Sequence, residues 1–146
     1  MEPEKLSKFR KLVEDGVIDK SPATPDRDYN CIAFALDIED AVWWPGRDDC
    51  FWPDDDDDQG IENFERVFSI RGFETCIHGI FEPGFEKVAF YVARGEVTHA
   101  AKQLTDGRWK SKIGVDWEDI EHNTVHGVES NLYGAAKHFM KRKIPS

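Results

Sequence analysis

The chain has 146 residues, of which 19 are lysine or arginine and 29 are aspartate or glutamate, so its formal net charge is −10. This length fits one domain, residues 1–146, in which 1–28 are expected to form an N-terminal helix and an approach segment. The chain has no run of about 18 apolar residues, so we expect no membrane partner, and the negative charge disfavours nucleic acid.

The three cysteines have no metal-ligand spacing, and three is an odd number for a disulfide framework. This favours reduced thiols in a cytoplasmic protein, although delivery as a secreted effector stays open. We expect neither a structural metal nor a cofactor.

A helix and an extended segment are the first predicted elements. Apolar residues at helical spacing predict a helix that ends near Gly16 (Leu6, Phe9, Leu12 and Val13). Residues 16–29 hold two prolines and many polar side chains, which favours an extended approach to the next element.

Asn30 and Cys31 stand directly before the apolar run 32–36, and this pattern predicts the start of a buried helix. Asparagine is a favoured N-cap residue because its side-chain oxygen accepts a hydrogen bond from a backbone N–H one turn ahead. Cys31 would then lie in the first turn, where the helix dipole stabilises a thiolate. Cys31 is therefore a candidate nucleophile; the alternative is a small buried hydrophobic residue.

The segment Asp37–Glu65 combines tryptophans with a concentration of negative charge. It holds twelve acidic residues and one basic residue, Arg47, whereas the rest of the chain carries about +1. Trp43, Trp44 and Trp52 are candidates for the wall of a substrate groove; the alternative is that they cap the core. This acidic lobe is either a docking surface for a basic partner or a solvated loop.

The run Asp54–Asp58 has the composition of a calcium loop but not its spacing. A twelve-residue EF-hand loop needs glycine at position six and glutamate at position twelve. A start at Asp54 places Gly60 one position late, and a start at Asp55 places Arg66 at position twelve. We expect an exposed loop without a tightly bound metal, and weak cation binding stays open.

The second half of the chain is predicted to hold a helix, several strands and a last helix. Four apolar residues share one face of a helix that ends at Gly72 (Ile61, Phe64, Val67 and Phe68). Strands are expected at 73–77, 87–93, 96–104 and 108–113, with turns at 94–95 and 105–107. Ser130 is a candidate N-cap for a final helix that reaches about Arg142. Helices followed by an antiparallel sheet indicate an α+β fold.

His99 lies in the expected strand 96–104 and is the candidate base for Cys31. An imidazole beside a thiol takes its proton and later returns it to the leaving group. The alternative is a core histidine that is bonded to a backbone carbonyl.

Four blocks carry a resemblance to a known family: 29–36 around Cys31, Trp43-Trp44-Pro45, 98–104 around His99, and 109–114. Together they resemble a family of small, largely uncharacterised bacterial proteins that is similar to papain-like hydrolases, especially NlpC-type cell-wall peptidases. The resemblance covers roughly residues 28–142. It implies a papain-like α+β fold, in which the helix that bears the cysteine packs on a small antiparallel sheet. It also implies that Cys31 is the nucleophile and His99 the base, but it implies no substrate.

The resemblance also implies a polar residue that orients the histidine, and two residues are candidates. Ser111 lies on the strand after His99, and His122 is chemically the stronger orienting group. Pro25 stands where papain-type enzymes have an oxyanion-stabilising glutamine, so the oxyanion would rely on the Cys31 N–H and another donor.

These observations predict a thiol hydrolase or transferase that acts on amide bonds of a peptide or of another amide-bearing substrate. The expected substrate-binding residues are Asn30, Trp43, Trp44 and Trp52. The alternative is a non-enzymatic acidic protein of the immunity type, which masks a basic partner surface with the lobe Asp37–Glu65.

Overall fold

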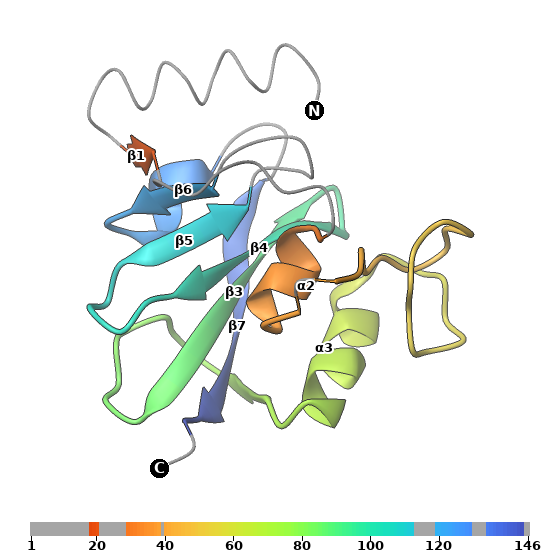
Figure 1. The fold of residues 1–146 in the computed structure, drawn as a ribbon, viewed down its shortest axis with the longest axis horizontal. Coiled ribbons are helices and arrows are strands. Elements are labelled where there is room, and N and C mark those ends of the chain that lie inside the picture. Colours follow the sequence, from red (N-terminus) through yellow and green to blue (C-terminus); the bar gives the residue numbers. More distant parts are fainter. Residues whose placement is uncertain (1–17, 21–28, 39, 113–118, 130–133, 145–146) are drawn as a thin grey trace.

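The computed structural model describes residues 18–20, 29–38, 40–112, 119–129 and 134–144. Seven strands in this part of the chain form one sheet in the order β1-β6-β5-β4-β3-β7-β2 (Figure 1). All neighbouring pairs are antiparallel. The strands are β1 (Ile18–Lys20), β2 (Glu74–Cys76), β3 (Phe85–Ala93), β4 (Glu96–Gln103), β5 (Trp109–Lys112), β6 (Asp119–His122) and β7 (Ala135–Lys143).

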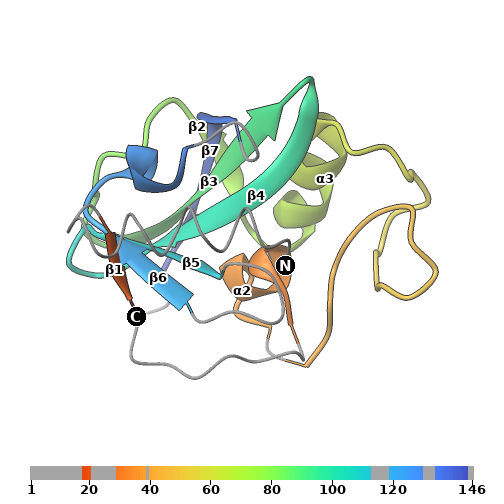
Figure 2. The same ribbon diagram turned by 90° about the horizontal axis from the view of Figure 1, so that it is seen from above.

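The described helices are short. They are α2 (Cys31–Ala35), α3 (Ile61–Ile70) and a 3₁₀ turn, η1 (Val125–Val128). Figure 2 shows α3 and η1 on opposite sides of the central strands β3 and β4. We call the side covered by α2 and α3 the helix face, and the other side the opposite face.

The two faces follow from the alternation of side chains along β3. Phe90 contacts Phe64 and Phe68 of α3, so it points to the helix face. Its neighbour Tyr91 points to the opposite face, where its hydroxyl donates to the Val125 carbonyl of η1. Both side chains are fully buried. The sheet is therefore covered on both sides, and successive residues of one strand enter different environments.

The hairpin between β3 and β4 confirms the turn predicted at Arg94-Gly95. Both residues have positive φ, 53° and 79°, as a two-residue type I′ turn requires. Helix α3 confirms the predicted helix that ends at Gly72, whose φ of 90° suits glycine. The helix predicted to end near Gly16 lies outside the described residues.

The predicted papain-like α+β fold is wrong. The described chain is dominated by a seven-stranded antiparallel sheet, and the helix that carries Cys31 has only five residues. It ends early because Leu36 leaves the helical conformation and Asp37 follows with φ of 63°. Two short helices on one face do not make the helix-bearing papain-like arrangement.

The predicted C-terminal helix is also wrong, because residues 135–143 form β7. Strand β7 lies between β3 and β2, and it exchanges ladder hydrogen bonds with both. Phe139 lies opposite Ala89, whereas Met140 lies opposite Val88, so successive apolar residues fill both faces of the sheet. Sheet pairing thus overrides the helical spacing of these residues. The candidate cap Ser130 lies outside the described residues.

Candidate functional site

Asn30 caps helix α2 as predicted. Its side-chain oxygen accepts a hydrogen bond from the Ala33 N–H at 3.2 Å. The same oxygen accepts from the Trp43 N–H at 3.1 Å, and the Asn30 Nδ2 donates to the Trp43 carbonyl at 2.8 Å. The Asn30 amide therefore fastens the start of α2 to the tryptophan segment, and its role in substrate binding stays a prediction.

Cys31 occupies the first turn of α2 and is 8% exposed within the hydrophobic core. Cys31, Cys50 and Cys76 form no disulfide with one another. Burial is the largest cause that raises the pKa of the Cys50 thiol, with Asp49 adding to it. Burial likewise raises the pKa of the Cys76 thiol. Neither Cys50 nor Cys76 is thus prepared as a nucleophile.

His99 is fully buried on the opposite face of the sheet. It lies across from Tyr91 in the β3–β4 ladder, and the two ring centroids are 5.2 Å apart. The next residue, Ala100, pairs with Phe90 and belongs to the core under the helices. Helix α2 lies on that helix face, as shown by Lys110, whose ammonium group is 5.7 Å from the centre of the Phe34 ring. The Cys31–His99 pair stays a prediction.

Ser111 and His122, the two candidates for the orienting residue, contact each other. Ser111 Oγ lies 2.9 Å from His122 Nε2, and His122 Nδ1 lies 2.7 Å from the Thr124 carbonyl. A carbonyl can only accept, so Nδ1 carries the proton and Nε2 accepts from the Ser111 hydroxyl. Burial lowers the pKa of His122 to about 4, with a smaller contribution from Arg108. The pair is therefore a neutral, fully buried hydrogen-bond unit near neutral pH.

The three predicted tryptophans pack over the start of α3. The rings of Trp44 and Trp52 lie 5.5 and 5.0 Å from Phe64, and Trp43 lies 6.5 Å from Trp52. The Trp52 indole also donates to the Asn63 side chain at 3.1 Å. These contacts are those of a cap on the core, and a groove-lining role for the rings stays a prediction.

Residues 46–60, which we call the acidic loop, extend away from the sheet (Figure 1). Three alternate aspartates of the run 54–58 accept hydrogen bonds from backbone N–H groups two residues ahead, at 2.9, 2.9 and 2.5 Å (Asp54, Asp56 and Asp58). In the described part of the chain, no group of three or more His, Cys, Asp or Glu side chains is placed to hold a metal ion.

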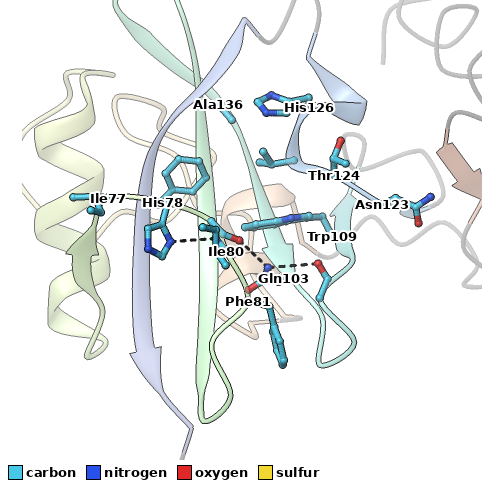
Figure 3. Close-up of a pocket in the computed structure, with 14 residues that line it drawn as sticks. Ile77, His78, Ile80, Phe81, Gln103, Trp109, Asn123, Thr124, His126 and Ala136 are labelled. Carbon is cyan, nitrogen blue, oxygen red and sulfur yellow. Dashed lines mark hydrogen bonds between the residues drawn. The ribbon is translucent and has the colours of Figure 1, made fainter.

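Sequence reasoning missed a cavity of about 610 Å³ on the opposite face. Figure 3 shows Gln103 and Trp109 within it, together with Ile80 and Phe81 from the segment between β2 and β3. Gln103 gave little signal in the sequence, because its strand also contains Glu96, His99 and Lys102. Strand alternation alone could not reveal that residues 77–81 fold over it.

The family model described as a domain of unknown function (DUF7689) matches residues 20–141. The chain belongs to this family. Neither the curated proteins nor the solved structures include a match. Membership assigns no activity, and the resemblance to NlpC-type peptidases stays a prediction. Among the described residues, no helix is long and apolar enough to cross a membrane.

Proposed function

We propose that this chain is a binding protein whose acidic loop docks on a basic surface of another protein. The observation that carries the proposal is a set of exposed carboxylates without cationic partners. Asp48, Asp55 and Asp57 are exposed and form no ion pair within the described part of the chain. A basic surface would supply the charge that the chain itself does not.

Internal cations neutralise the loop only in part. Arg47 pairs with Asp49 at 3.1 Å, and Arg66 of α3 pairs with Asp54 at 3.4 Å and Asp56 at 2.8 Å. These exposed pairs are worth little in free energy, and the two Arg66 pairs join the loop to α3.

The loop is held in one shape before any partner arrives. The Asn63 side chain is buried and donates to the backbone carbonyls of Asp56 and Asp58 at 2.9 and 2.7 Å. Its oxygen accepts from the Trp52 indole, which anchors the other end of the loop to the core. A preorganised loop loses little conformational entropy on binding, and this favours recognition over a solvated spacer.

Binding of a labelled deca-lysine peptide tests the proposal by fluorescence anisotropy. The variant Asp48→Asn/Asp55→Asn/Asp57→Asn should bind about tenfold more weakly than the wild type at roughly 20 mM salt. The control Glu4→Gln/Glu74→Gln/Asp106→Asn removes the same charge at positions outside the acidic loop and should change binding less than about twofold. Equal weakening by both triple variants would show that only net charge matters, and the docking assignment would fail.

A loosened loop gives a second readout. Asn63→Ala removes the two bonds to the loop backbone without changing its charge. We expect weaker peptide binding with an unchanged dependence on salt concentration, because the same carboxylates are less well placed. Unchanged affinity would contradict the preorganised surface.

A thiol hydrolase or transferase acting on amide bonds is the second candidate, favoured by the position of Cys31 after the Asn30 cap. In that reaction His99 takes the thiol proton, the thiolate attacks the carbonyl and the C–N bond breaks. The amine then leaves with the proton, and water or an amine cleaves the thioester. It ranks second because His99 and α2 lie on different faces of the sheet.

Iodoacetamide labelling against pH, read by peptide mass spectrometry, tests this second candidate. A catalytic Cys31 should react faster near neutral pH than Cys50 or Cys76, whose thiol pKa values are raised. His99→Ala should slow Cys31 and leave Cys50 unchanged. If Cys31 titrates near about 8.5 or above, or if the variant changes nothing, the enzymatic candidate is removed.

A further inference from the structure

The cavity on the opposite face is separate from the acidic loop. It is bounded by aromatic side chains of the sheet and by a rim from the segment 77–81. Trp109 and Phe139 form an aromatic wall on the sheet side. The segment 77–81 forms the rim, with large apolar side chains exposed to solvent by 93, 67 and 40% (Ile77, Ile80 and Phe81). Exposed apolar side chains that gather around one hollow commonly mark a binding site.

The rim is held in place by a glycine that fits between two rings. A Cβ added to Gly79 would lie 2.9 Å from both the Trp109 and the Phe139 ring. Gln103 Nε2 donates to the Gly79 carbonyl at 2.9 Å and to the Gly107 carbonyl at 3.4 Å, as the dashed lines in Figure 3 mark. The rim backbone is therefore fastened to the sheet, and the hollow is a fixed feature of the surface.

The Gln103 side chain leaves one hydrogen-bond acceptor unused. Two carbonyls face its Nε2, so the amide cannot be turned around without setting oxygen against oxygen. Gln103 is 6% exposed, and its Oε1 is buried with no hydrogen-bond partner in the described part of the chain. A buried amide oxygen without a donor costs free energy that a ligand donor would recover. Because this oxygen is buried, the exposed Ile80 and Phe81 side chains must change rotamer to admit such a donor.

The lining also selects against charge. Among the described residues, no lysine, arginine, aspartate or glutamate lines the cavity, and its polar margin consists of neutral groups and histidines (Asn123, Thr124, His78 and His126). Aromatic walls favour a planar ring, since stacked and edge-on rings attract each other beyond their buried area.

From these observations we propose that the cavity between Trp109, Gln103 and residues 77–81 binds a small, uncharged, planar aromatic molecule that donates an N–H hydrogen bond to Gln103 Oε1. The cavity of about 610 Å³ is within the range of small-molecule sites. The site shares no residue with the acidic loop, so a negative result for this site leaves the proposed function untouched.

Indole and indene are a matched pair of probes, because they have nearly the same shape and only indole has an N–H. Amide and indole resonances of the ¹⁵N-labelled protein would be followed during titration with each compound. We expect millimolar binding of indole, with shifts at the Gln103 side-chain amide and the Trp109 indole. Indene should bind about three- to tenfold more weakly, as expected for one lost hydrogen bond.

Two exposed isoleucines provide matched variants. Ile80→Asp places a charge on the rim and should weaken indole binding more than tenfold, whereas Ile70→Asp on α3, where residue 70 is 70% exposed, should leave it unchanged. Absence of shifts at the cavity would overturn the site. Equal binding of indole and indene would overturn the assigned hydrogen bond, and equal effects of both variants would show that binding is not at this rim.

Discussion

His122 is a buried imidazole that stays neutral because its pKa is lowered to about 4. Its two nitrogens are both in use, one toward the Thr124 carbonyl and one toward Ser111. Protonation at Nε2 would reverse the hydrogen bond, so that the Ser111 hydroxyl accepts, and would place a positive charge inside the protein, which burial disfavours. The structure therefore resists protonation of a residue that takes up a proton readily when the chain is unfolded.

This arrangement predicts that stability falls with acid over a defined range. The unfolded chain binds the proton near pH 6.5 and the folded chain only near pH 4, so stability is lost as pH falls through this interval. The contribution of His122 should decrease by about 2 kcal/mol between pH 7 and pH 4.5.

Urea unfolding of the wild type and His122→Gln at the two pH values measures this contribution. The variant should lose less stability on acidification, because glutamine does not titrate, while the carboxylates affect both proteins alike. The same loss in both proteins would contradict the lowered pKa.

At the scale of elements, β7 depends on close contact between its first residues and β3. Gly134 has φ of 76°, and a Cβ added there would overlap the Val92 carbonyl oxygen. No rotamer change relieves this overlap, because the obstacle is backbone. The glycine thus lets the chain enter β7 beside β3, between β3 and the edge strand β2.

Gly134→Ala should therefore lower the free energy of unfolding by more than about 2 kcal/mol. Gly84→Ala is the matched control, because Gly84 also has positive φ, 88°, but no atom lies within 4 Å of its added Cβ. The control should cost about 1–2 kcal/mol, from backbone conformation alone. Denaturant unfolding measures both variants. Equal losses in the free energy of unfolding would show that the close approach of residue 134 to Val92 does not contribute to the cost.

At the scale of the whole molecule, the charge is unevenly distributed. The lobe Asp37–Glu65 carries −11, whereas the rest of the chain carries +1, and part of the lobe's charge lies on exposed side chains without cationic partners in the described part of the chain. Such self-repulsion opposes the folded state and is screened by salt. An acidic surface that is retained although its self-repulsion destabilises the fold is consistent with the proposed docking role.

Asp48→Asn/Asp55→Asn/Asp57→Asn should therefore raise the melting temperature by roughly 1–3 °C at low salt. The gain should disappear at about 1 M salt, where the screening length is only about 3 Å. Calorimetry in the two buffers measures the effect. A variant that melts lower than the wild type at low salt would mean that these carboxylates make stabilising contacts, against the unpaired arrangement described above.

The sequence by itself determined the local features whose cause lies within a few residues. Asn30 before Cys31 predicted a cap because an asparagine oxygen reaches the next turn, and that bond is present. Arg94-Gly95 between two segments of strand character predicted the hairpin, and both residues have the positive φ that such a turn requires. Gly72 predicted the end of α3 for a similar local reason.

Only the tertiary structure decided what depends on distant partners. Residues 135–143 have apolar residues at helical spacing, yet they form β7 because β3 and β2 supply hydrogen bonds on both sides. A bulge in the β3–β4 ladder near Tyr91 helps to set the register that directs His99 to the opposite face. The spacing of residues in the sequence does not predict this bulge. The cavity at Gln103 exists because residues 77–81 cross the sheet there, with Gly79 fitted between two rings from β5 and β7. Contacts between residues far apart in the chain depend on side-chain packing and strand pairing together. Local patterns in a single sequence do not predict them.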